Sequence, residues 1–265
     1  MKLEYEGQVL DFHIHPFADR EHNLCFFRET MDIRFETCLA DMDRCGVRQF
    51  AGSVIPKANG FRPPFRQIRE LNDEALRLRE LSRGRYIPGI HIHPAYMKES
   101  LEELRRMQRE DVRLVGELVP YLMGWNEFGY GSPPVQELME AAGEAGMVVS
   151  MHSGTPEDMD ALLAGCRKTA IVGAHPGNRE SFAAHVQRMK DHANYYLDLC
   201  GSEGIFRKGL LQTAVREVGA GRVLYGTDYP ICSPGATLAA VLLENLSPEE
   251  LDQILYRNAA SLLRI

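Results

Sequence analysis

Residues 9–16 read Val-Leu-Asp-Phe-His-Ile-His-Pro, a short apolar stretch that ends in two histidines and a proline. An apolar run of this length is typical of a strand that is buried on both faces of a parallel sheet. Proline cannot donate a hydrogen bond to a sheet, so it ends the strand and begins a loop. A proline also follows five later apolar runs, at Pro56, Pro94, Pro120, Pro176 and Pro230.

Apolar runs of this kind alternate with amphipathic helical stretches from end to end of the 265 residues. We predict strands at Val9–His15, Val47–Ile55, Tyr86–His93, Val112–Val119, Met147–His152, Thr169–His175, Tyr195–Cys200 and Arg222–Asp228. Helix-start signals lie between them, at Ser132-Pro133, at Thr155-Pro156 and in a capping box formed by Ser247 and Glu250. Eight strand–helix units in about 250 residues, without a linker, predict a single α/β domain over residues 1–265, a (β/α)8 TIM barrel. The competing architecture is an open doubly wound sheet, but no glycine-rich phosphate loop follows the first strand.

Composition and charge argue against several classes of partner. The chain is 45% hydrophobic and 25% charged, with a net charge of -7 and no run of basic residues. An acidic protein is a poor match for nucleic acid or an anionic membrane, so we expect neither as a partner. We also expect no signal peptide, because the first residues lack an apolar core, and no membrane span, because no segment is long and apolar enough. The six cysteines include no Cys-x-x-Cys pair, which favours reduced thiols and a cytoplasmic location.

Ionisable residues gather at the carboxyl ends of the predicted strands, which is the face where TIM-barrel active sites lie. His13 and His15 end the first strand, and their i, i+2 spacing points both rings to the same face. Further candidates end other strands: Glu117, His152, His175 and Asp228. Imidazoles with a carboxylate suit Zn²⁺ or another divalent first-row metal, which activates water. A lone His-x-His pair is a weak signal, but the gathering of further ionisable groups at one face indicates a metal site.

Three stretches resemble a known family: Asp11-Phe12-His13-Ile14-His15-Pro16, residues 173–177 (Gly-Ala-His-Pro-Gly) and residues 225–230 (Tyr-Gly-Thr-Asp-Tyr-Pro). They resemble the amidohydrolase superfamily, and within it the amidohydrolase-related (amidohydrolase 2) branch, which includes aminocarboxymuconate-semialdehyde decarboxylase-like enzymes. Residues 254–263 are similar to the closing helix of that branch, so the resemblance spans the chain. The resemblance implies one divalent ion per chain, held by His13, His15, His152 and Asp228. It further implies that His175 either orients or deprotonates the metal-bound water or contacts the substrate. Asp228 would also receive the proton of that water.

Glu117 has two interpretations that the sequence leaves open. Its position resembles the strand-four glutamate of TatD-type nucleases, where a carboxylate helps to bind a second metal. The alternative is a carboxylate that supports the site through hydrogen bonds without touching the metal. We therefore retain Glu117 as a candidate ligand and leave a second ion open. We expect the second His-x-His pair, His91 and His93, and also Asp198 to line or support the site rather than bind the ion.

The leading functional hypothesis is hydrolysis, in which activated water attacks a small ester, lactone or amide-type substrate. The alternative is metal-dependent, non-oxidative decarboxylation of a small aromatic or unsaturated carboxylic acid, which uses the same residues. Two weaker alternatives are a TatD-like nuclease, which the acidic charge disfavours, and a non-catalytic metal-binding scaffold. Aromatic residues in the loops suggest a partly apolar or ring-containing small molecule, and Arg20, Arg62 and Arg179 are candidates to receive a carboxylate. A homodimer is the default expectation for assembly.

Overall fold

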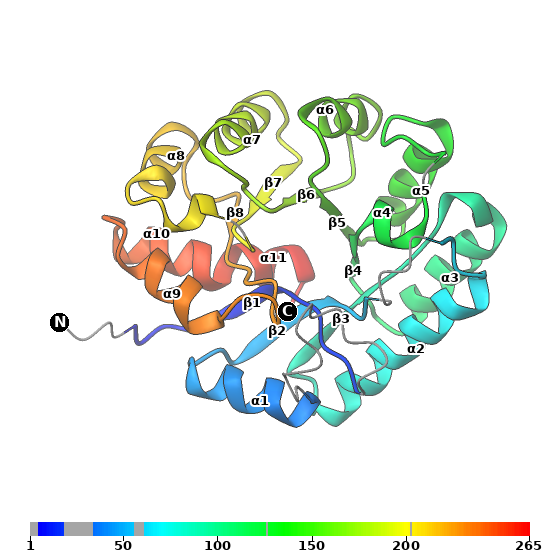
Figure 1. The fold of residues 1–265 in the computed structure, drawn as a ribbon, viewed down its shortest axis with the longest axis horizontal. Coiled ribbons are helices and arrows are strands. Elements are labelled where there is room, and N and C mark those ends of the chain that lie inside the picture. Colours follow the sequence, from blue (N-terminus) through cyan, green and yellow to red (C-terminus); the bar gives the residue numbers. More distant parts are fainter. Residues whose placement is uncertain (1–4, 19–33, 56–60, 126, 202) are drawn as a thin grey trace.

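In the computed structural model, the strands form one parallel sheet in the order β1 to β8, and each strand pairs with the next (Figure 1). The structure describes residues 5–18, 34–55, 61–125, 127–201 and 203–265. The strands are β1 (Leu10–Ile14), β2 (Gln49–Ser53), β3 (Tyr86–Ile90), β4 (Leu114–Leu118), β5 (Val148–His152), β6 (Ile171–Ala174), β7 (Tyr195–Asp198) and β8 (Val223–Leu224). All eight predicted strands are confirmed. Most of them end earlier than predicted, so that His15, His91 and His175 lie just beyond their strands.

Backbone hydrogen bonds between β1 and the chain after β8 close the sheet into a barrel. Phe12 N donates to Tyr225 O at 2.8 Å, and Asp228 N donates to His13 O at 2.7 Å. An isolated bridge also joins Ile14 to Tyr229. The TIM barrel is therefore confirmed, and the open doubly wound sheet is excluded.

Helices surround the sheet (Figure 1). They are α1 (Phe35–Arg44), α2 (Phe65–Leu81), α3 (Met97–Arg109), α4 (Pro120–Met123), α5 (Pro133–Glu144), α6 (Pro156–Gly165), α7 (Arg179–Asp191), α8 (Leu210–Val218), α9 (Pro234–Leu242), α10 (Pro248–Asp252) and α11 (Asn258–Leu263), with 3-10 turns η2 (Pro94–Tyr96) and η3 (Glu203–Phe206) and a π-helical turn η4 (Gln253–Arg257). The predicted starts of α5, α6 and α10 are confirmed, and Thr155 and Ser247 form capping boxes. Within the described residues, no helix is long and apolar enough to cross a membrane.

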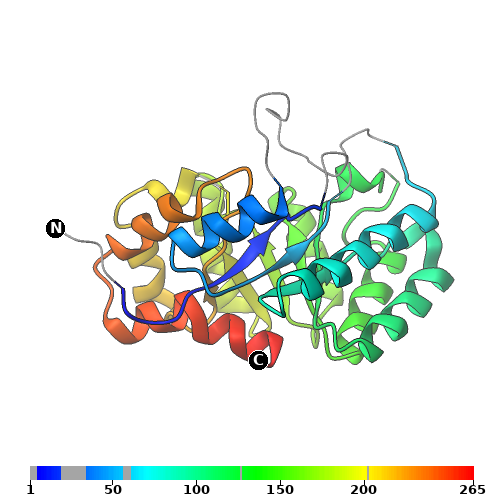
Figure 2. The same cartoon turned by 90° about the horizontal axis from the view of Figure 1, so that it is seen from below.

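The barrel has an inner apolar core that α11 closes at one end. The inner core is formed by Leu10, Phe12, Ala51, Leu114, Val148, Val172 and Leu224 of the strands, together with Ala259 and Leu263 of α11. Most of these strand residues lie near the amino ends of their strands, so α11 covers the amino end of the barrel, and Figure 2 shows this helix along one end of the molecule. The opposite end, where the strands finish, is therefore the end that is available for a site.

Candidate metal centre

Four buried side chains bring donor atoms together at the carboxyl end of the barrel. His13 Nε2 and His15 Nε2, at the end of β1, lie 3.0 Å apart. Glu117 Oε2, from β4, lies 3.3 Å from each of these nitrogens. Asp228 Oδ1, beyond β8, lies 3.4 Å from His15 Nε2 and 3.8 Å from His13 Nε2. We call these four side chains the first cluster.

The spacing within the first cluster fits a divalent cation. Metal–ligand distances of about 2.0–2.2 Å place neighbouring donors about 2.8–3.6 Å apart in octahedral or tetrahedral geometry. The separations of 3.0, 3.3 and 3.4 Å fall in this range, and the 3.8 Å between His13 Nε2 and Asp228 Oδ1 lies just above it. Two buried carboxylates that face the same pair of imidazoles also require positive charge, because an unpaired buried carboxylate is costly. The residues present therefore fit a bound divalent ion.

The other carboxylate oxygen of Glu117 faces a second set of side chains. Glu117 Oε1 lies 2.9 Å from His152 Nδ1 and 3.1 Å from His175 Nε2. The rings of His152 and His175 meet edge to face, with their centroids 4.7 Å apart. We call Glu117, His152 and His175 the second cluster; their donor atoms are close enough together to hold an ion. Glu117 thus belongs to both clusters, with one oxygen in each.

An irregularity in β4 turns Glu117 toward the inside of the barrel. Alternate residues of a regular strand face inward. Here Leu114 packs in the inner core, whereas Val115 packs outward, in the larger apolar core that the strands share with the surrounding helices. Unbroken alternation would give Glu117 the outward direction of Val115. Instead, the pairing register with β5 shifts between Val115 and Leu118. Gly116 lies in this segment with φ of +100°, and a Cβ there would lie 2.1 Å from Ser150 O, so only glycine fits.

His175 and Asp228 both have left-handed backbone conformations, each with φ of 64°. Residues other than glycine rarely adopt this conformation, and such outliers cluster at functional sites. The backbone N–H of His175 donates to Cys200 Sγ at 3.3 Å, which helps to hold it. Gly201 lies against both residues, since a Cβ there would be 2.5 Å from Asp228 Oδ2 and 3.0 Å from His175 Nδ1. The loop after β7 therefore reaches the site closely only because it carries glycine.

The two histidines of β1 are oriented by partners behind their rings. His13 Nδ1 lies 2.6 Å from Asp198 Oδ2, and His15 Nδ1 lies 3.0 Å from Ser53 O. A carbonyl oxygen can only accept, so His15 carries its proton on Nδ1 and presents the Nε2 lone pair to the first cluster. Asp198 orients His13 in the same way, and a carboxylate in this position raises the basicity of a metal-binding imidazole. This is the supporting role that the sequence predicts for Asp198.

Replacing Asp198 with asparagine removes the negative charge behind His13, and we expect the Asp198→Asn variant to bind a divalent ion about 10–100-fold more weakly. Competition with a chromophoric chelator measures the affinity, and the melting temperature of the metal-free protein shows whether the fold is intact. Asp191→Asn, at an exposed position at the end of α7, is the control. An unchanged affinity in Asp198→Asn would contradict the assignment.

Charge within the clusters shifts the pKa values of histidine and glutamate in opposite directions. Burial alone would lower the pKa of His13 and of His175, but the negative charge of Glu117 opposes it, and both pKa values lie well above the ordinary one. Burial alone would raise the pKa of Glu117, but His13 and His175 outweigh it and hold that pKa well below the ordinary value. At neutral pH the metal-free protein therefore pairs two protonated imidazoles with an ionised Glu117.

Binding of a divalent ion at neutral pH is expected to release protons, because an imidazole must be neutral to act as a ligand. The pKa of His13 is raised in the metal-free protein, so metal affinity should increase with pH and level off above that pKa. Calorimetric titration with Mn²⁺ in two buffers of different ionisation enthalpy measures the released protons. Equal heats in the two buffers, or an affinity that does not change with pH, would count against this electrostatic description.

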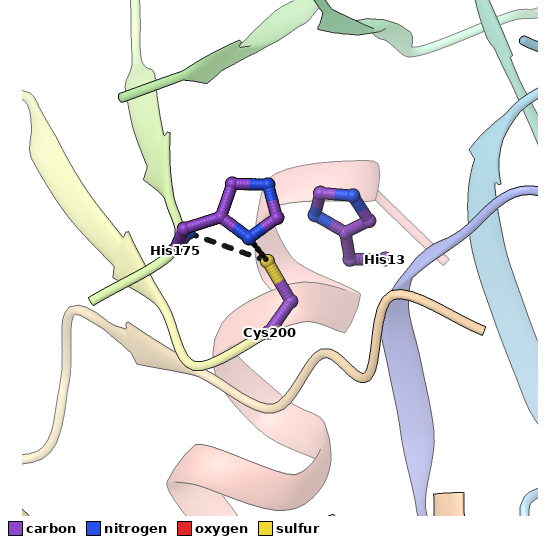
Figure 3. Close-up of side chains that lie close together, drawn as sticks. All are labelled: His13, His175 and Cys200. Carbon is purple, nitrogen blue, oxygen red and sulfur yellow. Dashed lines mark hydrogen bonds between the residues drawn. The ribbon is translucent and has the colours of Figure 1, made fainter. Parts of the chain in front are cut away.

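Cys200, just beyond β7, contacts His175 from behind. Cys200 Sγ lies 3.4 Å from His175 Nδ1, and Figure 3 shows this thiol beside the rings of His175 and His13. Burial raises the pKa of the Cys200 thiol, so it is a neutral partner that orients the His175 ring. The sequence did not reveal this pair, because no spacing pattern connects a residue after β6 with one after β7.

The resemblance implies that His152 binds the ion together with His13 and His15. In the structure, however, His152 does not lie beside that pair. It meets Glu117 and His175 in the second cluster, whereas Glu117 lies next to His13 and His15. His91 and His93, which we expected to line or support the site, are each held by a hydrogen bond to a backbone carbonyl. The Nε2 atom of His91 donates to Val54 O at 2.9 Å, and that of His93 donates to Met123 O at 2.9 Å.

An aromatic residue and two of the candidate arginines lie in the described loops and helices around the site. The ring of Tyr121, in α4, meets His152 at 5.2 Å between centroids and is 59% exposed, so an accessible aromatic surface adjoins the second cluster. Arg62 forms an ion pair with Glu127, and Arg179 begins α7. Arg20 lies outside the described residues.

Comparison with known proteins identifies the family. The model of the amidohydrolase family matches residues 10–265, so the chain belongs to this family. No curated protein sequence matches the chain.

Solved structures share the fold over nearly the whole chain. A 2,6-dihydroxybenzoate decarboxylase from Rhizobium is 15% identical, with a TM-score of 0.76 over 97% of this chain and 99% of that one. A 5-carboxyvanillate decarboxylase from Sphingomonas paucimobilis is 14% identical, with a TM-score of 0.71 over 97% and 99%. A dihydroxybenzoic acid decarboxylase from Polaromonas sp. JS666, solved with bound manganese and the inhibitor 2-nitroresorcinol, is 16% identical, with a TM-score of 0.68 over 97% of each chain. At these identities, the similarity establishes the shared barrel.

Proposed function

We propose that this protein is a metal-dependent decarboxylase that removes carbon dioxide, without oxidation, from a small aromatic or unsaturated carboxylic acid. The observation that carries the proposal is the first cluster, which lies at the carboxyl end of a barrel shared with decarboxylases of aromatic acids. One of those decarboxylases contains manganese. The hydrolysis that the sequence favoured becomes the second candidate, because the comparisons support the decarboxylase alternative better.

The proposed ion is a divalent first-row metal held by His13, His15, Glu117 and Asp228. Two imidazoles and two carboxylates suit both Mn²⁺ and Zn²⁺, so the donor set alone does not choose between them. When bound, the ion would act as a Lewis acid that orients the substrate carboxylate and stabilises negative charge. Asp198 and the carbonyl of Ser53 keep the two imidazoles in position for this role.

His175 is the proposed proton donor. Its Nε2 faces the second cluster at the mouth of the barrel, and Cys200 orients the ring from the Nδ1 side. In a non-oxidative decarboxylation the carbon–carbon bond to the carboxylate breaks, carbon dioxide leaves, and the carbon that remains receives a proton. His175 would supply that proton and recover one from solvent. Tyr121 would pack against the substrate ring at the edge of the site.

A screen for carbon dioxide tests this proposal. Protein loaded with Mn²⁺ or Zn²⁺ is incubated with hydroxylated benzoates and unsaturated dicarboxylates, and the released gas is trapped and quantified. Parallel incubations with lactones, esters and amides monitor hydrolysis. Release of carbon dioxide that depends on the metal supports the proposal. Hydrolysis without carbon dioxide from any acid would overturn it.

Hydrolysis remains the second candidate because of one feature, the position of Glu117 between the two clusters. A carboxylate with one oxygen toward His13 and His15 and the other toward His152 and His175 is placed to bridge two ions. Two-metal sites favour hydrolytic reactions, because the pair of ions activates water and stabilises the leaving oxygen. A stoichiometry of two ions per chain, together with hydrolytic products, would favour this candidate.

A further inference from the structure

A histidine that belongs to neither cluster faces the same end of the barrel. In β3, Ile87 packs against the inner core, and alternation gives His91, just beyond the strand, the same inward direction. His15 Nδ1 and His91 Nε2 donate to consecutive carbonyls at the end of β2, those of Ser53 and Val54. His91 therefore lies beside the first cluster, on the β3 side of the barrel mouth.

One nitrogen of the His91 ring is satisfied and the other is not. Nε2 donates to Val54 O at 2.9 Å, which places the ring proton on Nε2 and makes Nδ1 an acceptor. Nδ1 is buried and has no hydrogen-bond partner among the described residues. Burial lowers the pKa of His91 to about 4, so the ring is neutral under ordinary conditions and Nδ1 keeps its lone pair.

The surrounding structure fixes this acceptor in place. Asn72 of α2 accepts a hydrogen bond from His91 N at 2.7 Å and donates one to His91 O at 3.0 Å. Asn72 also donates to Glu103 Oε1 at 3.0 Å, and both of these side chains are fully buried. A rigid, buried and unpaired acceptor destabilises the protein unless a bound molecule satisfies it, so its presence at the barrel mouth points to a ligand that carries a hydrogen-bond donor.

We propose that His91 Nδ1 accepts a hydrogen bond from a hydroxyl group of the substrate. The inference rests on the proposed decarboxylase function and specifies its substrate class: a small ring acid with a hydroxyl group close to the carboxylate. A site built to accept a hydroxyl hydrogen discriminates against an analogue that lacks it, because binding of that analogue leaves the buried nitrogen unpaired.

Two probes of nearly equal shape test the assignment. 2,6-Dihydroxybenzoate can donate hydrogen bonds, whereas 2,6-difluorobenzoate cannot. Calorimetry with the Mn²⁺-loaded wild-type protein should show about tenfold tighter binding of the dihydroxy compound. His91→Gln retains a donor near the Nε2 position for Val54 O but lacks an acceptor at the Nδ1 position, so it should lose about tenfold of this preference. His91→Asn places an amide oxygen near the Nδ1 position and should keep most of the preference.

Several outcomes would overturn the assignment. They are equal binding of the two probes by the wild type, failure of both to bind, a preference that survives in His91→Gln, or one that is lost equally in His91→Asn. The decarboxylase proposal would survive these outcomes, because it depends on the release of carbon dioxide from any acid in the screen. Nitrogen NMR of labelled histidine gives an independent readout. His91 Nδ1 should be unprotonated at neutral pH and should shift when 2,6-dihydroxybenzoate is added; a protonated Nδ1 contradicts the inference.

Discussion

The Glu117→Gln variant is expected to lose the bound ion and nearly all activity. In the wild-type protein, the two carboxylate oxygens of Glu117 contact four imidazoles, those of His13, His15, His152 and His175. Glutamine offers a single acceptor oxygen, so its amide N–H₂ must face one cluster and repel either the ion or a protonated imidazole. Removal of one partner from a buried charge cluster costs about 3–5 kcal/mol, which corresponds to metal binding that is weaker by a factor of about a thousand.

Elemental analysis after gel filtration measures the bound metal, and turnover is measured in the same preparation. Glu137→Gln, at an exposed position in α5, is the matched control and should retain both metal and activity. Circular dichroism establishes that Glu117→Gln is folded. A folded variant that keeps a full complement of metal would show that Glu117 is not a ligand.

The His175→Asn variant is expected to keep the ion of the first cluster and to lose turnover by a factor of about 10²–10⁴, the usual contribution of a positioned acid or base. His13, His15 and Asp228 remain in this variant, so the donors on their side of Glu117 are unchanged. Asparagine cannot exchange a proton at neutral pH, and the turnover number should therefore fall more than the substrate affinity.

The matched control for this variant is His192→Asn, which changes a histidine at the end of α7. Metal content, turnover number and substrate affinity are measured side by side for the three proteins. The same experiment tests the scaffold alternative, since a scaffold has no turnover to lose. Full activity in His175→Asn would exclude His175 as the proton donor, and loss of all metal would place His175 among the essential ligands.

The barrel could be predicted from the sequence because its signals are local. Each strand is an apolar run that ends near a proline or a polar residue, and the starts of α5, α6 and α10 carry capping residues. The alternation of strand and helix then leaves few arrangements. That His13 and His15 share a face follows from the same pattern, because they occupy i, i+2 positions. Their inward direction depends on a register shift with β2 between Asp11 and Ile14, because Phe12 also packs in the inner core.

The distribution of residues between the clusters could not be predicted in this way. Regular alternation would point Glu117 outward, and only the register shift in β4 turns it inward. The left-handed conformations of His175 and Asp228 depend on contacts with the neighbouring strand ends, through Cys200 Sγ and His13 O. The resemblance to the family supplied the ligand candidates, but the division between the clusters is a property of the folded backbone.

The most direct test of the central claim is an anomalous diffraction measurement on crystals grown with Mn²⁺. The difference map should show a strong peak in the first cluster, in contact with His13 Nε2, His15 Nε2, Glu117 Oε2 and Asp228 Oδ1. A map from saturated crystals that shows no peak among these four atoms would contradict the assignment of a metal centre to this site.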